Sequence, residues 1–261
     1  MTGSSSPPIW RLTLLRAIIF DFDGVIVDSE PLIFRLTQQM AAQEHWTVTE
    51  AEYFRDYLAL DDRGIVEHLY RSHGRPVDAA RRDELVEWKK RAYADEIRDG
   101  LPAVPGAVEF VRSLAAQYPL AIASGSLRSE IEHLLSNLGL RDAFQLIVAA
   151  DDVERSKPAP DIFLKTLEAL RRLPGFRAAE AGSHDVPLAP LLARECLVIE
   201  DAPNGVRAAH AAGMPCLALA HSRPLDELAH ADWVARDFSG VDLAAIIAAF
   251  HLFPPEGRLS P

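Results

Sequence analysis

The sequence predicts an α/β fold: a three-layer, Rossmann-like parallel sheet that carries a small all-helical cap domain inserted after its first strand. Three observations predict it. A short apolar run at 16–21 stands apart from the others, residues 31–100 show helical spacing with no convincing strand, and strand-like and helical segments alternate after residue 106. Such alternation implies a mostly parallel sheet with helices on both of its faces.

The first strand is expected at 16–21, where the run AIIF is bounded by charged residues, as in a strand buried on both faces. Each of the next four segments places apolar residues three or four positions apart, which gives a helix one buried face. These expected helices are Leu32–Glu44, Thr49–Leu58, Gly64–His73 and Asp78–Glu96. The segment LPAVPG, with two prolines and a glycine, is then expected to be a linker before a further helix at Ala107–Gln117.

Strands and helices alternate from there to residue 219. The expected strands are Leu120–Ala123, Leu146–Ala149, Leu197–Ile199 and Pro215–Leu219. The expected helices between them are Arg128–Leu138, Pro160–Leu173 and Gly205–Ala212. We therefore expect ligands to gather at the carboxyl ends of the strands.

This order predicts a core domain split between 9–30 and 101–254, a cap domain at 31–100, and flexible termini at 1–8 and 255–261. The linkers are expected near Ser29–Pro31 and Gly100–Pro105. Residues 174–190 contain Gly, Ser and Pro and read as a surface excursion. Its His184-Asp185 pair is expected to be solvated, and its role is not readable from the sequence.

Composition excludes several classes of protein. The 261 residues carry 27 Lys+Arg against 38 Asp+Glu, a formal charge of −11, so a nucleic acid would be repelled. The first ten residues hold no apolar signal segment, and the longest apolar stretch, 243–253, is too short to span a bilayer. Cys196 and Cys216 are expected to be buried thiols in a reducing compartment. We expect a cytoplasmic protein with no membrane partner.

Acidic and hydroxyl side chains follow the first two core strands. Asp21 and Asp23 come where the first strand opens into a turn at Gly24. They are either capping aspartates at a solvated strand end or paired acids with separate roles, one ionised and one protonated. Ser124 and Gly125 precede a helix, where they either cap it or bind an anion on its backbone amides.

The third and fourth core strands lead to a lysine and to a second acidic pair. Lys157 stands between the third strand and a helix in a segment with two prolines, although a lone lysine is usually on the surface. Glu200 and Asp201 end the fourth strand, where burial is costly unless they bind a cation. All four sites fall on one edge of the predicted sheet and together suit a metal ion and a phosphate.

In this order, the four sites resemble the motifs of the haloacid dehalogenase superfamily phosphohydrolases, in the subgroup with a helical cap that includes β-phosphoglucomutases and phosphoglycolate phosphatases. The resemblance covers nearly the whole chain. It implies that Asp21 is the nucleophile and Asp23 the general acid and base. It also implies that Mg²⁺ is held by Asp21, the backbone carbonyl of Asp23, and Asp201, with Glu200 nearby, directly or through water.

Phosphate would then be bound by Ser124, Gly125 and Lys157. In similar enzymes the cap closes over the site and contacts the substrate. Arg63, in a loop between two cap helices, and Lys89 are the candidates for that contact, with solvent-exposed charge as the alternative. The cap position where sugar-phosphate mutases of this subgroup resemble one another in carrying His is Ile33 here.

The sequence therefore predicts a Mg²⁺-dependent phosphatase that hydrolyses a small phosphorylated metabolite, a sugar phosphate or a phosphoglycolate-like acid, through an aspartyl-phosphate intermediate. A phosphomutase is the first alternative, and Ile33 argues against it. The second is a non-catalytic binding protein that keeps the fold. We expect a monomer or weak dimer, and the sequence leaves the substrate open.

Overall fold

The computed structural model describes residues 15–58, 60–176 and 190–250. Its centre is a six-stranded parallel sheet in the order β3-β2-β1-β4-β5-β6. The strands are β1 (Ala17–Phe20), β2 (Leu120–Ala123), β3 (Phe144–Val148), β4 (Cys196–Glu200), β5 (Cys216–Leu219) and β6 (Trp233–Ala235). From β1 the chain adds β2 and β3 on one side of the sheet, and it then crosses over to add β4, β5 and β6 on the other side. The carboxyl ends of the neighbours β1 and β4 therefore form the topological switch point, where such sheets bind ligands.

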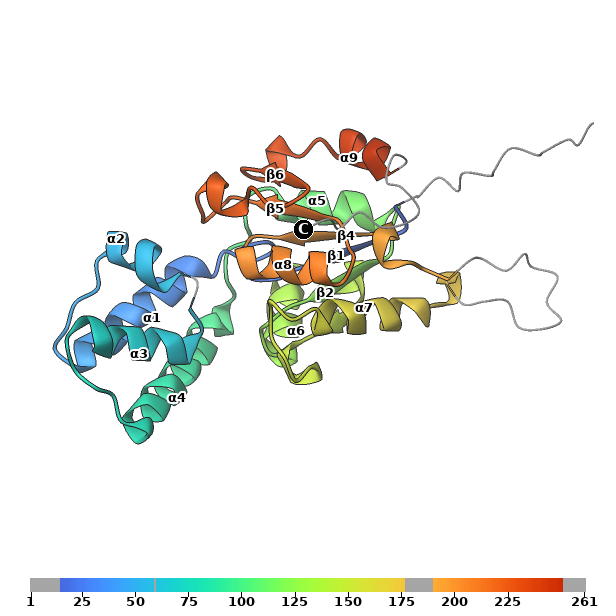
Figure 1. The fold of residues 1–261 in the computed structure, drawn as a ribbon. Coiled ribbons are helices and arrows are strands. Elements are labelled where there is room, and N and C mark those ends of the chain that lie inside the picture. The colour runs from blue at the N-terminus through green and yellow to red at the C-terminus, as the bar shows by residue number, and fades with distance from the viewer. Residues whose placement is uncertain (1–14, 59, 177–189, 251–261) are drawn as a thin grey trace, which may run out of the picture.

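Helices cover both faces of this sheet (Figure 1). They are α5 (Ala107–Ala115), α6 (Arg128–Asn137), α7 (Asp161–Arg171), α8 (Pro203–Ala211) and α9 (Leu243–Phe250). The side chains of strand β1 point alternately to the two faces of the sheet, and helices bury them on both faces. Ile18 and Phe20 join the cluster that includes α5, α6 and α9, whereas Ala17 and Ile19 join the cluster that includes α7 and α8.

The first four α-helices after β1 form the cap, which Figure 1 shows beside the sheet. They are α1 (Glu30–Gln43), the short α2 (Glu50–Glu52), α3 (Asp62–Ser72) and α4 (Ala79–Glu96). Their apolar faces make a separate core around Met40, Ile65 and Leu69. The predicted fold class, with its inserted helical cap, is confirmed, while the predicted domain boundaries stay predictions.

Several elements differ from expectation, and helix α9 was not predicted. The helix expected at Thr49–Leu58 is a short α-helix with a Thr49 capping box, followed by a π-helical turn at Tyr53–Tyr57. Strand β3 begins two residues earlier than expected, at Phe144. Strand β6 was not predicted, because it has only three residues and pairs only on one side, with β5.

Both cysteines are free and buried, on the neighbouring strands β4 and β5, as expected. Burial raises the pKa of Cys196 to about 12. Among the described helices, none is both long and apolar enough to cross a membrane. The termini 1–8 and 255–261, and the His184-Asp185 pair with most of the excursion around it, lie outside the described residues.

Candidate active site

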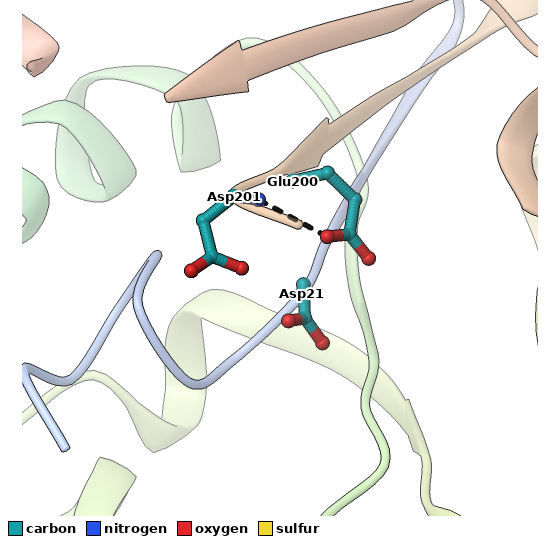
Figure 2. Close-up of side chains that lie close together, drawn as sticks. All are labelled: Asp21, Glu200 and Asp201. Carbon is teal, nitrogen blue, oxygen red and sulfur yellow. Dashed lines mark hydrogen bonds between the residues drawn. The ribbon is translucent and has the colours of Figure 1, made fainter. Parts of the chain in front are cut away.

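Three buried carboxylates meet where β1 and β4 end. Asp21, Glu200 and Asp201 each bring one oxygen within 4.8 Å of the others' (Figure 2). The parallel pairing of β1 with β4 fixes this meeting, and the amide of Asp21 continues it by donating to the carbonyl of Ile199 at 2.9 Å. Burial is the largest cause that raises the pKa of Asp201, and repulsion from Glu200 and Asp21 adds to it.

The turn after β1 packs directly against this cluster. Gly24 has φ +71°, and a Cβ built on it would lie 2.2 Å from Oδ2 of Asp201. Its amide donates to the carbonyl of Val27 at 2.8 Å. Only glycine combines the left-handed conformation with this close approach, so the sequence DFDG sets the distance between the first acidic pair and Asp201.

Glu200 is held by donors on both carboxylate oxygens. Oε1 accepts a hydrogen bond from Lys157 at 2.6 Å, and Oε2 accepts from the amides of Asp201 and Ala202 at 3.0 and 3.2 Å. Helix α8 covers it so closely that a Cβ on Gly205 would lie about 2 Å from the carboxylate. Glu200 therefore anchors Lys157 and the start of α8.

Lys157 binds the carboxylates of both strands. Its Nζ donates to Oδ1 of Asp21 at 2.8 Å, to Oε1 of Glu200 at 2.6 Å, and to the carbonyl of Ala123 at 3.1 Å. The ring of Phe163 lies 5.2 Å from the ammonium. Burial alone would lower the pKa of Lys157, but the two carboxylates outweigh it and raise that pKa, so the side chain is a fixed cation.

Asp23 has surroundings different from those of Asp21. The hydroxyl of Ser126 donates to its Oδ2. Burial raises the pKa of Tyr93 in cap helix α4, which lies close enough for the charge of Asp23 to raise that pKa further. Desolvation raises the pKa of Asp23 and outweighs the hydrogen bond from Ser126, while repulsion from Asp21 adds to the rise. The protonated form of Asp23 is thus favoured relative to that of an ordinary aspartate.

Ser124 and Gly125 lie at the end of β2. Ser124 is 1% exposed, and its hydroxyl accepts a hydrogen bond from the amide of Ser126 at 3.1 Å. Gly125 and Lys157 line a cavity of about 800 Å³ that extends from the core to the cap residues Leu58 and Asp61. The four predicted sequence sites are therefore close to one another beside a cavity large enough for a small metabolite.

The two cap candidates are placed differently from each other. Arg63 is exposed near the start of α3. Lys89 is 5% exposed, and its Nζ donates to Oδ1 of Asp62 at 2.5 Å. Neither of the two lines the cavity. The alternative of solvent-exposed charge therefore fits Arg63 and does not fit Lys89.

Several residues around the site were not singled out from the sequence. Ser126 and Tyr93 contact Asp23, and Ser222, in the loop after β5, donates to Oδ2 of Asp201 at 3.4 Å. Next to it, Arg223 donates to the carbonyl of Leu58 in the cap at 2.8 Å. Only Ser126 had a signal in the sequence, since it lies two residues from Ser124.

The donor set suits a hard divalent cation. Carboxylate oxygens are the protein ligands that Mg²⁺ prefers. Here Asp21, Glu200 and Asp201 are buried together, and their negative charge exceeds that of the one lysine bound to them. The arrangement can therefore hold a metal ion, with Asp21 and Asp201 better placed as ligands than Glu200, whose oxygens already have protein donors.

Comparison with known proteins agrees with this geometry. The model of the haloacid dehalogenase-like hydrolase family matches residues 18–219, which span β1 to β5. The chain belongs to this family. It is 30% identical to a phosphorylated carbohydrates phosphatase of Thermotoga maritima over 209 residues, which are 77% of this chain and 82% of the relative. It is 31% identical to a fructose-1-phosphate phosphatase of Escherichia coli over 205 residues, which are 76% and 92%.

The fold of this haloacid dehalogenase-like hydrolase also matches solved structures. One is CbbY from Rhodobacter sphaeroides, crystallised with xylulose-1,5-bisphosphate, which aligns with a TM-score of 0.69 at 22% identity over 88% of this chain and 98% of that one. At this identity the similarity concerns the fold. Together the comparisons confirm the family and the phosphatase class predicted from the sequence.

Proposed function

We propose that this chain is a Mg²⁺-dependent phosphatase that hydrolyses a small phosphorylated metabolite through an aspartyl-phosphate on Asp21. The observation that carries the proposal is the ion pair of Asp21 with Lys157, inside the cluster of buried acids and beside the cavity. A carboxylate that attacks a phosphate dianion meets like-charge repulsion. Lys157 offsets part of that repulsion at a fixed position, which is how positioned charge accelerates phosphoryl transfer.

In the first step, a carboxylate oxygen of Asp21 attacks phosphorus and the bond from phosphorus to the ester oxygen breaks. Protonated Asp23 gives its proton to the leaving oxygen, so the alcohol departs neutral. The hydrogen bond from Ser126 to Asp23 holds this carboxyl in place for the transfer. Ser124 and the amide of Gly125 would bind the non-bridging oxygens.

In the second step, water attacks phosphorus of the aspartyl-phosphate and Asp23 takes up its proton. The bond from phosphorus to Asp21 breaks, which releases inorganic phosphate and restores both aspartates. Asp21, Asp201 and the backbone carbonyl of Asp23 would hold Mg²⁺. Glu200 would hold Lys157 in position beside them through its hydrogen bond. When bound, the ion supplies charge neutralisation of the phosphate oxygens and of Asp21.

The names of the relatives indicate the substrate class. Two of them are phosphatases of phosphorylated carbohydrates and of fructose 1-phosphate, and others are phosphoglycolate phosphatases. A sugar phosphate or a phosphoglycolate-like acid therefore fits both these names and a cavity of about 800 Å³.

The test is phosphate release from a panel of sugar phosphates, phosphoglycolate, nucleotides and p-nitrophenyl phosphate, each with Mg²⁺ and with EDTA. We expect release from at least one small phosphoester with Mg²⁺ and none with EDTA. Equal release in both conditions would refute the metal dependence, and no release from any compound would refute the phosphatase proposal.

The mutase alternative is tested on the same protein with a hexose 1-phosphate. Ile33 packs against the cap core and offers no proton-transfer group. We therefore expect free phosphate as the product. Formation of the 6-phosphate isomer with little free phosphate would favour the mutase.

A further inference from the structure

Arg223 is a buried cation whose hydrogen bonds are incomplete. Its side chain is 7% exposed, and Nη2 donates to the carbonyl of Leu58 at 2.8 Å. Nη1 lies 3.8 Å from Oε2 of Glu227, which is beyond hydrogen-bond distance. Nε is buried and has no hydrogen-bond partner among the described residues. Buried polar groups are normally partnered, so an open donor on a buried arginine calls for an explanation.

Nε has almost no accessible surface, so the donor that can reach a ligand is Nη1, which has no hydrogen bond to the described residues either. The cavity that Arg223 lines is where such a ligand would lie. Lys157 and Gly125 lie on its wall, Leu58 and Asp61 of the cap form another part of it, and the Arg223 side chain crosses between core and cap. The next residue back, Ser222, reaches Asp201 at 3.4 Å, so the loop after β5 lies beside the acid cluster. Arg223 and Lys157 line the same cavity, and Lys157 binds Asp21, so a molecule whose phosphoryl group is at Asp21 can extend through this cavity toward Arg223.

The other two cationic side chains that line the cavity already bind groups of the protein. Lys157 is bound to Asp21 and Glu200, and Arg207 is exposed and donates to the side chain of Asn204 at 2.6 Å. Arg223 alone among the described lining cations is both buried and left with an open donor. A guanidinium fork matches the oxygens of a carboxylate or a phosphate.

We propose that Arg223 is a specificity-determining residue that binds a second acidic group of the substrate, so that the enzyme selects phosphoesters which also carry a carboxylate or a further phosphate. The proposal rests on the proposed phosphatase function and names its substrate class. The competing explanation is that Arg223 only tethers the cap to the core through Leu58. A tether would affect all substrates alike, whereas a specificity residue affects only those with the second acid.

The test compares matched substrates on the purified chain with Mg²⁺. Each pair differs in the second group: phosphoglycolate against 2-hydroxyethyl phosphate, 3-phosphoglycerate against glycerol 3-phosphate, and a pentulose 1,5-bisphosphate against the 5-phosphate. In the wild type we expect kcat/KM at least tenfold higher for the acidic member of at least one pair. The first two pairs report on a carboxylate and the third on a phosphate, so the preferred pair identifies the group.

The variant Arg223→Gln should lower that ratio at least tenfold, chiefly through KM of the acidic member. Arg223→Lys keeps the charge without the fork and should retain part of the ratio. The control is Arg55→Gln, an exposed cap arginine paired with Asp56, which should leave the ratio unchanged. If Arg223→Gln does not fold, Arg223→Lys and the wild-type ratio still decide.

Binding without turnover gives a second readout. In an Asp21→Asn background, the acidic member of the preferred pair should raise the melting temperature more than its neutral counterpart, and adding Arg223→Gln should remove that difference. A wild type without preference in any pair, or an unchanged ratio in Arg223→Gln, would overturn the inference while leaving the phosphatase proposal standing. Absence of phosphate release from every substrate would instead overturn the phosphatase proposal and this inference with it.

Discussion

At the scale of single residues, Asp21 and Glu200 both bind Lys157 but are equipped for different tasks. Glu200 accepts from Lys157 on one oxygen and from two backbone amides on the other, and it is fully buried. Asp21 is 8% exposed and faces the acid cluster beside the cavity. The side chain with fewer protein donors is the one that can attack a substrate.

The first prediction concerns this nucleophile. Asp21→Asn removes the attacking carboxylate and a metal ligand together, so phosphate release should fall by roughly 10³-fold or more. Cooperative urea unfolding should persist, because the change also relieves repulsion among the buried acids. Asp56→Asn, at a partly exposed cap position, serves as control and should keep full activity. Full activity in Asp21→Asn would show that another residue is the nucleophile.

The second prediction concerns Gly24. Alanine there must adopt φ near +71° and places its Cβ against Asp201, so the free energy of unfolding should drop by about 2 kcal/mol or more and half-maximal activity should need more Mg²⁺. Gly74→Ala is the matched control, because Gly74 has φ +66° with open space around it. It isolates the backbone cost of about 1 kcal/mol. Equal losses of stability in the two variants would show that the contact with Asp201 is unimportant.

Residues at strand ends could be found from the sequence, because parallel strands bring consecutive carboxyl ends to one edge. Asp21, Ser124, Lys157 and Glu200 were found in this way. Tyr93 and Arg223 were not, since the first approaches Asp23 from the last turn of cap helix α4 and the second reaches the cap from the loop after β5. Such contacts depend on how the cap sits on the core, which local patterns do not encode.

At the scale of elements, helices α3 and α4 of the cap are joined by a pair of unequal burial. Lys89 of α4 has a side chain 6% exposed, whereas that of Asp62 on α3 is 35% exposed. Removing the carboxylate of Asp62 leaves the buried ammonium of Lys89 without its charge partner, but removing Lys89 leaves a carboxylate that water can reach.

The third prediction follows from this asymmetry. Asp62→Asn should lower the free energy of unfolding by about 2 kcal/mol, and Lys89→Met should lower it by less than about 1 kcal/mol, as measured by urea denaturation. The double variant should resemble Lys89→Met. A larger loss for Lys89→Met than for Asp62→Asn would contradict the assignment of the lysine as the desolvated partner.

The edge of the sheet depends on Asp232, just before β6. Its Oδ2 lies 2.9 Å from Nε2 of His210 in α8 and accepts from the amide of Cys216 in β5 at 2.8 Å. Burial would raise the pKa of Asp232, but these hydrogen bonds outweigh it and lower that pKa. The carboxylate thus ties β6 to its neighbours. Strand β6 has only three residues, which is too short for a recognisable strand pattern, and the hydrogen bonds of Asp232 that hold it in place cannot be read from the sequence. This explains why β6 was not predicted.

The fourth prediction is the pH dependence of this contact. A group whose pKa is lowered in the folded state stabilises the fold above its unfolded pKa, near 3.9, and loses that contribution as pH falls through the folded value. Asp232→Asn should therefore cost about 1 kcal/mol at pH 7, and the difference from wild type should shrink below about pH 4. Asp226→Asn, at an exposed position, should track the wild type throughout. A pH-independent difference would contradict the ionised carboxylate as the cause.

At the scale of the whole molecule, the order of the strands brings the acidic residues of the site together, and their repulsion destabilises the fold. Placing β4 beside β1 brings Asp21, Glu200 and Asp201 together, and burial with mutual repulsion raises the pKa of Glu200 and Asp201. The alternation of strands and helices was enough to predict the sheet and its cap. It did not predict how much the acids destabilise the fold, since that depends on their distances and burial.

A cation that binds only the folded site should therefore stabilise the whole chain, which is the fifth prediction. At 100 times its dissociation constant, Mg²⁺ should add about 2.7 kcal/mol and raise the melting temperature by roughly 5–10 °C. Asp201→Asn removes a carboxylate ligand and should reduce this rise to a small fraction. NaCl at matched ionic strength is the control for simple screening and should raise it much less. An equal rise with NaCl, or an undiminished rise in Asp201→Asn, would place the bound metal elsewhere or exclude a specific site, whatever the outcome of the activity assays.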